Sequence, residues 1–203
     1  MGNWAELVVN VNKQLGRKEV RGGELFLMLR IISEREYVGR YYLSEKLSLG
    51  EATIRNILNA LKQLNVIEAY RGGHRLTPLG RSIVDEIKRN LEIHQDFDLG
   101  ISGESVLFIV RKFSDKLGSV LDFRDNIIRE GGRGAIILEY RNGKLIFPDS
   151  GLPVSVWRED VAEKVMEKTV LNEGDVVIIV SSDTQKEAIL SGLNTILNYL
   201  NPN

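Results

Sequence analysis

Apolar residues recur at helical spacing between residues 49 and 64, where the pattern is clearest in the chain. The apolar positions share one helix face and are Ile54, Ile57, Leu58, Leu61 and Leu64. The opposite face is small or polar and consists of Ala52, Arg55, Asn56, Asn59 and Gln63. Ser48 followed by Glu51 predicts a capping box that starts the helix at Leu49. Asn65 predicts its end, because asparagine tolerates the left-handed conformation of a C-terminal cap.

Periodicity and turn residues predict further helices and a β-hairpin around this helix. Gly72 and Gly73 lie between two short strands and are expected to form the hairpin turn. Thr77 then caps a helix that starts at Pro78 and runs to about Ile93. The other expected elements are helices over 3–16 and 24–34, a strand or turn over 37–42, a brief helix over 43–49, and hairpin strands over 66–70 and 75–77.

After residue 105 the pattern changes to short apolar runs that alternate with amphipathic segments. Strands are expected over 106–111, 134–141, 144–148 and 175–181, and helices over 120–130, 158–169 and 181–200. In the second of these helices, Val161, Val165 and Met166 are expected to face inward. The order βαββαβ plus a C-terminal helix predicts a two-layer α/β sandwich with an antiparallel sheet, ferredoxin-like or related.

The predicted fold class is therefore α+β, with two domains. The first domain is expected over 1–94, an acidic, glycine-containing linker over 95–104, and the second domain over 105–203. Residues 1–90 carry a net charge of +5 and residues 91–203 carry −6. A basic first part suits a nucleic-acid-binding domain joined to a second domain of another function.

Composition excludes several kinds of chemistry. The chain has no cysteine, which excludes disulfides, thiolate metal sites and a cysteine nucleophile. The start of the chain lacks the pattern of a signal peptide, and no segment approaches the roughly 18 apolar residues of a membrane span. We therefore expect a cytoplasmic protein that does not interact with membranes.

Residues 24–83 resemble a winged helix-turn-helix domain, the module of many transcription regulators. The resemblance is carried by LSEKLSLGEATIRNILNALKQLNVI and by YRGGHRLTPLG. The chain departs from the usual pattern at Asn65, where glycine is common. The whole chain also resembles archaeal proteins that join such a domain to an uncharacterised C-terminal α/β domain. The resemblance implies a regulator and supplies no ligand.

In a winged helix the recognition helix enters the major groove and the hairpin wing contacts the neighbouring backbone. The resemblance thus implies double-stranded DNA as a partner. The residues expected to approach or read bases are Ala52, Thr53, Arg55, Asn56 and Asn59. The residues expected to contact phosphates are Arg71, His74, Arg75 and Arg81. The alternative interpretation is a solvated surface or a protein-docking face.

Specific DNA sites normally require two-fold dimers, so a homodimer is expected. The helix over 3–16 and the C-terminal helix, with Ile189, Leu193, Ile196, Leu197 and Leu200, offer apolar stripes for pairing. Either stripe has an ordinary alternative role as intramolecular core.

The second domain offers weaker candidates. A polar pocket for a small-molecule effector is one hypothesis, with surface ion pairs as the alternative, and its residues are Asp115, Asp122, Arg124, Asp125 and Asp149. His74 and His94 lack partners at metal-ligand spacing, so neither a metal nor another cofactor is expected. No G-x-S-x-G, H-E-x-x-H or Walker-type motif is present, and the chain is not expected to be an enzyme.

The functional hypothesis is a sequence-specific DNA-binding transcription regulator. Its second domain is expected to sense a small molecule or to mediate dimerisation. Two alternatives stay open from the sequence. One is an enzyme of unknown reaction in the second domain with an appended DNA-binding domain, and the other is a winged helix used for protein docking.

Overall fold

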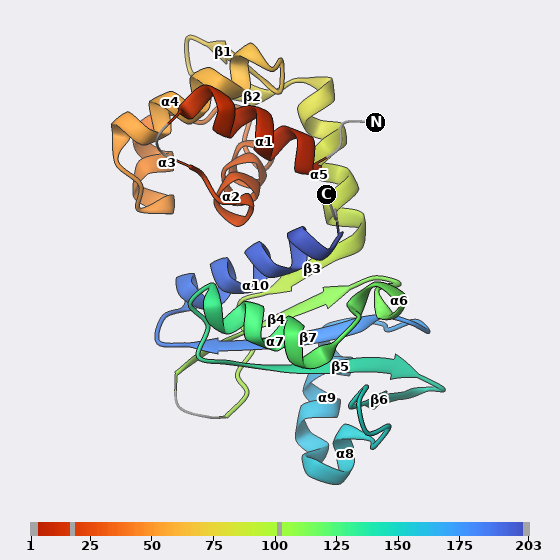
Figure 1. Ribbon diagram of the computed structural model, residues 1–203. Helices are drawn as coiled ribbons and strands as arrows, with labels where there is room; N and C mark the ends of the chain where they lie inside the picture. Colours follow the sequence, from red (N-terminus) through yellow and green to blue (C-terminus); the bar gives the residue numbers. More distant parts are fainter. Residues whose placement is uncertain (1–3, 17–18, 101–102, 201–203) are drawn as a thin grey trace. The chain divides into compact units, whose positions relative to one another are not determined.

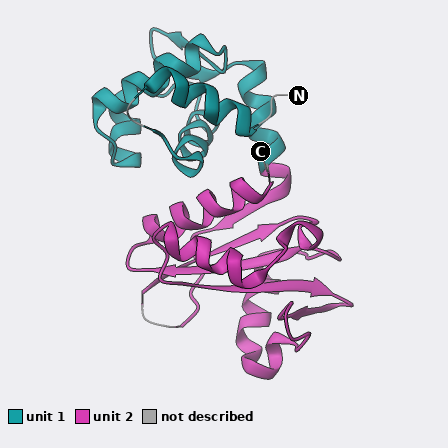
Figure 2. Ribbon diagram, in the orientation of Figure 1, with its two compact units in different colours: residues 1–87, 201–203 teal, residues 88–200 magenta. Residues whose placement is uncertain are grey.

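The computed structural model describes residues 4–16, 19–100 and 103–200 (Figure 1). The chain is mixed α/β and divides into two compact units, a helical unit that ends at Ile87 and a sheet-containing unit from Lys88 to Leu200 (Figure 2). This boundary differs from the predicted one. Helix α5 (Pro78–Asn90) ends early, and Leu91–His94 forms strand β3 of the second unit. Leu91 fits both helical and alternating spacing, and backbone pairing with β4 (Glu104–Val110) decides for the strand.

The first unit contains helices packed around one apolar core and a two-stranded hairpin. Its elements before α5 are α1 (Trp4–Leu15), α2 (Gly22–Ser33), α3 (Arg40–Leu47), α4 (Glu51–Gln63), β1 (Ile67–Tyr70) and β2 (Gly73–Leu76). The apolar face of α4 is buried and includes Ile54, Ile57, Leu58 and Leu61. Helix α1 packs against α4. The Trp4 ring of α1 packs edge-on against the Phe26 ring, with 6.1 Å between the ring centroids. The predicted apolar stripe of α4 is thus part of the core.

The turn before α4 differs from the prediction, whereas the turn after α4 agrees with it. Ser48 adopts a left-handed conformation (φ 51°) and ends α3, so the expected Ser48 capping box is wrong and α4 begins at Glu51 after Gly50. Asn65 has the predicted left-handed conformation (φ 57°). The Asn65 N–H donates to the Lys62 carbonyl, and the Val66 N–H donates to the Leu61 carbonyl. These two hydrogen bonds form a Schellman-type C-terminal cap.

The segment over 37–42 combines a bridge and a helix start. Val38 forms an antiparallel bridge with His74 of the hairpin, whereas α3 already begins at Arg40. The expected strand or turn is therefore limited to the residues before Gly39. The bridge attaches the hairpin to the connection between α2 and α3.

A close backbone contact fixes the start of α5 against the hairpin. Thr77 caps the helix as predicted, because its Oγ1 accepts from the Gly80 N–H at 3.1 Å and donates to the Asn65 carbonyl at 2.7 Å. A Cβ on Gly80 would lie 2.1 Å from the Val66 carbonyl oxygen, closer than any side chain tolerates. Only glycine at this position lets the helix approach the residue before β1 so closely.

In the second unit, five antiparallel strands form one sheet in the order β3-β4-β7-β5-β6. The strands not yet defined are β5 (Gly134–Arg141), β6 (Lys144–Ile146) and β7 (Val176–Ser182). The helices are α6 (Ser114–Leu117), α7 (Val120–Arg129), α8 (Val154–Trp157), α9 (Glu159–Lys168) and α10 (Gln185–Leu200). Asn142 and Gly143 form the predicted turn between β5 and β6, both with positive φ.

Helices cover both faces of this sheet, so the predicted two-layer sandwich is wrong and the unit has three layers. Figure 1 shows α7 and α10 on one face and α8 and α9 on the other. Phe108 of β4 meets α10 at Gly192, whereas the neighbouring Leu107 packs in a cluster with Val161 and Val165 of α9. The physical reason is that β4 and β7 are almost continuously apolar, and strands of this kind must be covered on both sides.

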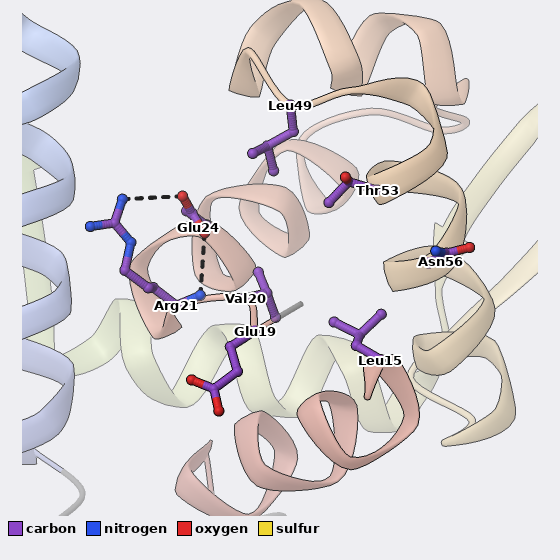
Figure 3. Close-up of a pocket in the computed structure, with 8 residues that line it drawn as sticks. All are labelled: Leu15, Glu19, Val20, Arg21, Glu24, Leu49, Thr53 and Asn56. Carbon is purple, nitrogen blue, oxygen red and sulfur yellow. Dashed lines mark hydrogen bonds and ion pairs between the residues drawn. The ribbon is translucent and has the colours of Figure 1, made fainter. Parts of the chain in front are cut away.

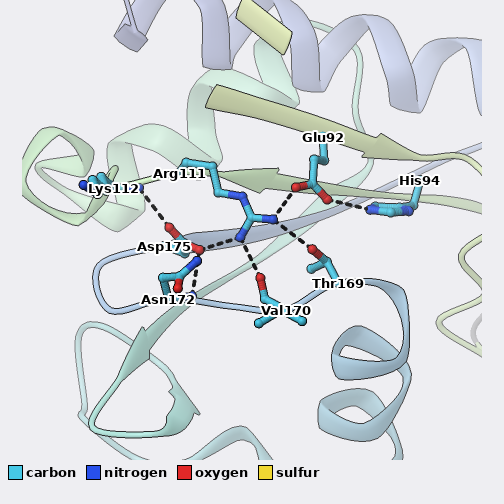
Figure 4. Close-up of polar contacts among 8 residues, drawn as sticks. All are labelled: Glu92, His94, Arg111, Lys112, Thr169, Val170, Asn172 and Asp175. Carbon is cyan, nitrogen blue, oxygen red and sulfur yellow. Dashed lines mark hydrogen bonds and ion pairs between the residues drawn. The ribbon is translucent and has the colours of Figure 1, made fainter. Parts of the chain in front are cut away.

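Arg111, the residue after β4, joins several segments of the second unit (Figure 4). Its guanidinium donates to Asp175 Oδ2 at 2.6 Å, to Thr169 Oγ1 at 2.8 Å and to the Val170 carbonyl, and it pairs with Glu92 of β3. Burial raises the pKa of Glu92, but the hydrogen bond and charge of Arg111 outweigh burial and lower it below its ordinary value. The Asp175 side chain is only 1% exposed and also accepts from the Lys112 N–H.

We predict that Gly80→Ala lowers the free energy of unfolding of the first unit by about 2 kcal/mol. The steric overlap with the Val66 carbonyl exceeds the ~1 kcal/mol that alanine gains over glycine in a helix. Chemical denaturation followed by Trp4 fluorescence, in a Trp157→Phe background, measures the change. Gly39→Ala is the control, since nothing lies within 4 Å of its Cβ position. Equal stability of the two variants would contradict the packing argument.

Arg111→Met is expected to destabilise the second unit by about 3 kcal/mol, because it leaves the Asp175 carboxylate buried without its cation. Hydrogen–deuterium exchange of the amides in β4 and β7 measures the loss. The control is Arg133→Met, which removes a pair with Asp183 whose side chains are 69% and 54% exposed, and it should change stability by less than about 1 kcal/mol. Similar exchange in both variants would show that the Arg111 network is dispensable.

Candidate nucleic-acid interface

The outer face of α4 presents three of the predicted residues side by side. Ala52, Arg55 and Asn59 are all exposed and lie at helical spacing, opposite the buried stripe of the same helix. Arg55 forms no ion pair among the residues that the structure describes. This face therefore offers a guanidinium and an amide to a partner, beside a small residue that permits close approach.

Thr53 and Asn56 lie on a flank of α4 that borders a cavity of about 330 Å³ (Figure 3). The cavity is also lined by Leu15, Glu19, Val20, Arg21, Glu24 and Leu49. Thr53 is half-buried, and an ion pair between Arg21 and Glu24 (3.2 Å) lies in the wall. The structure thus separates Thr53 from the outer face of α4, whereas Asn56 is exposed at the edge between the two.

Arg75 is engaged within the hairpin. Its Nε donates to Glu68 Oε1 at 2.7 Å, its Nη2 donates to the Tyr70 hydroxyl at 2.6 Å, and its guanidinium lies 4.2 Å from the Tyr70 ring centroid. The hydrogen bond from Arg75 lowers the pKa of Glu68, and Glu68 in turn raises the pKa of Arg75. Arg75 stays a predicted phosphate contact, but Glu68 partly offsets its charge across the two strands.

The other predicted phosphate contacts have different surroundings. Arg71 is exposed at the hairpin turn and Arg81 is exposed on α5, and neither forms an ion pair within the described ranges. His74 is half-buried, and its Nδ1 lies 3.4 Å from the Val38 carbonyl. Arg71 and Arg81 are available to a partner, whereas His74 mainly helps to hold the hairpin on the connection before α3.

Basic and aromatic residues at the start of α3 were missed by the sequence reasoning. Arg40 is exposed, Tyr41 is 71% exposed, and the Tyr42 ring has Arg35 at 4.3 Å and Lys46 at 5.6 Å from its centroid. The sequence signal for them is the aromatic and basic run over 37–42. Arg40 adds a further exposed cation to the first unit.

The predicted effector residues line neither the cavity beside α4 nor the groove between β6, α8 and α9. Arg124 is exposed and Asp125 half-buried on α7, and Asp149 is exposed in the turn after β6 that leads to α8 on the opposite face of the sheet. Asp115 and Asp122 are exposed on α6 and α7. In the described part of the chain, no three His, Asp or Glu side chains form a candidate metal site.

Most residues of both apolar stripes predicted for dimerisation are buried. Trp4, Leu7 and Val11 of α1 are buried in the first unit, where α1 packs on α4. Helix α10 packs on α7, β4 and β7 of the second unit, and its stripe residues Ile189, Leu193, Ile196 and Leu197 are buried.

Comparisons with known proteins place two domain families along the chain. Residues 25–82 match the family described as the PH0730-like N-terminal domain, and residues 101–199 match a domain of unknown function, DUF4443. A solved structure, hypothetical protein PH0730 from the archaeon Pyrococcus horikoshii OT3, is 26% identical with a TM-score of 0.67, over 87% of this chain and 91% of that chain. No curated protein matches.

No helix of the described residues is long and apolar enough to cross a membrane.

Proposed function

We propose that the chain is a sequence-specific DNA-binding transcription regulator whose first unit acts as a winged helix-turn-helix domain. In this proposal α4 is the recognition helix and the β1–β2 hairpin is the wing. The observation that carries it is the outer face of α4, where Arg55 and Asn59 project from a helix held rigidly by its buried face. A polar face on a fixed helix is what reading base edges requires.

The side chains on this face have defined base-pairing chemistry. Arginine donates two hydrogen bonds to guanine O6 and N7, and asparagine forms a bidentate pair with adenine N6 and N7 in the major groove. Ala52 supports the proposal because a small residue lets the helix approach a thymine methyl group. Arg55 and Asn59 would thereby select sequence.

Affinity in this proposal comes mainly from cations outside the recognition helix. Apart from Arg55, the exposed part of α4 carries only Lys62 as a positive charge, near its C-terminal end. Arg40, Arg71 and Arg81 are exposed on α3, the hairpin turn and α5. Such residues contact phosphates, which fix position and orientation without reading sequence.

One recognition helix touches few bases, so the proposed regulator acts as a homodimer on a two-fold site. The second unit supplies the pairing in this proposal.

The purified full chain is expected to enrich a two-fold symmetric motif from a random pool of double-stranded DNA. Arg55→Ala and Asn59→Ala should each relax selectivity at one position per half-site, weakening binding to the selected site about 5- to 150-fold. Arg124→Ala, a change at an exposed arginine of the second unit, is the control. A pool without any enriched sequence would refute the proposal and favour the protein-docking alternative.

Arg71→Ala and Arg75→Ala are expected to differ in their effect on DNA binding. Loss of Arg71 removes an available phosphate contact, so it should weaken binding to all sequences and reduce the salt slope of log K by about 0.9. Loss of Arg75 should reduce the slope less, because Glu68 already offsets its charge. Fluorescence anisotropy over a salt series measures both slopes. An unchanged slope for Arg71→Ala would exclude the hairpin turn from the interface.

A further inference from the structure

The second unit exposes large apolar side chains around α8 and α9. We call this region the α8–α9 surface and define it by Leu152 (56% exposed), Val156 (74%), Trp157 (51%) and Met166 (46%). Met166 was expected to face inward, but only Val161 and Val165 of α9 are buried. Contiguous exposed apolar patches on a folded protein usually mark an interaction site.

A groove of about 190 Å³ lies between the turn into β6 and the two helices, and Met166 is the residue that it shares with this surface. Its walls include Leu145, Val154, Ala162 and Met166, with Lys144 on the β6 side and the carboxylates Glu159 and Glu163 on the α9 side. Trp157, at the end of α8, packs edge-on against Phe147 with 6.0 Å between ring centroids. The tryptophan is thereby held in place while about half of it stays open to solvent.

We propose that the α8–α9 surface is the homodimer interface and that its occupant is the same surface of a second copy of the chain. The argument is charge complementarity within one patch. In a two-fold interface each residue meets its counterpart's neighbours in both directions, so a patch that carries both signs of charge can pair with itself. Lys144 of one copy then faces Glu159 and Glu163 of the other, and the reverse pairing follows by symmetry.

The apolar residues have a corresponding role in this dimer. Val156 is the most exposed of the four and lies beside Val154 and Ser155 of the groove wall. It is the side chain that enters the groove of the second copy, with Trp157 and Met166 covering it from water. Interfaces of this kind have a buried apolar centre and a charged rim. The inference rests on the proposed function only for the need to pair two recognition helices.

Sedimentation velocity of the full chain without DNA tests the surface. The wild-type chain should shift with concentration from its 22.9 kDa monomer to a species of twice that mass. Val156→Asp should weaken dimerisation by about tenfold or more, because it places an unpaired charge at the interface centre. Leu121→Asp is the matched control, an equally drastic change at a 62% exposed position of α7, and should leave the dimer unchanged.

Charge exchange supplies the second arm of the test. Lys144→Glu and Glu163→Lys should each weaken the dimer, and the double variant should recover toward wild-type affinity, as a merely structural defect would not. Far-UV circular dichroism confirms folding, and Met166→Glu replaces Val156→Asp if the latter fails to fold. A monomeric wild type, or a dimer indifferent to these changes, would overturn the inference. A chain that dimerises but binds no DNA would refute the proposed function alone.

Discussion

Burial of one face of α4 is the constraint on which the first unit depends. Because Ile54, Ile57, Leu58 and Leu61 must leave water, the opposite side of the same helix must face it. The helix is stopped by Asn65, after which the chain turns directly into β1. The contact of Gly80 with the Val66 carbonyl then fixes where α5 starts. Burial of the apolar face of α4 therefore determines which of its side chains face solvent together in the candidate interface.

A second constraint is the double-sided burial of β4 and β7. Their apolar runs require helices on both faces of the sheet, and α10 is used to cover one of them. Phe108 of β4 meets α10 at Gly192 on this face. The short helices α8 and α9 cover the other face with Val154, Val161 and Val165, and they leave Val156, Trp157 and Met166 exposed.

The basic residues differ in how far neighbouring carboxylates offset their charge. Arg75 and Arg111 are each held by carboxylates, Glu68 for the first and Glu92 with Asp175 for the second. Arg71 carries the same charge at the exposed hairpin turn and forms no such pair in the described residues. A count of basic residues therefore overestimates the charge that a domain offers to a partner, since paired cations stabilise the fold and contribute less to attraction.

The sequence by itself determined the local features of this protein. Helical spacing located α4 and its outer residues Arg55 and Asn59, and residue chemistry located the turns at Asn65, Thr77-Pro78 and Asn142-Gly143. These features depend on residues within a few positions in the chain, so they can be predicted from the sequence alone.

Only the tertiary structure decided what depends on distant partners. Leu91 is a strand residue because it forms backbone hydrogen bonds with β4, and the charge of Arg75 is partly offset because the strand register places Glu68 opposite it. Ser48, which had seemed to begin α4, ends α3 instead, because the turn between the two helices requires a left-handed residue there. Periodicity indicates which residues are buried, but the surface that buries them is formed by residues distant in the sequence.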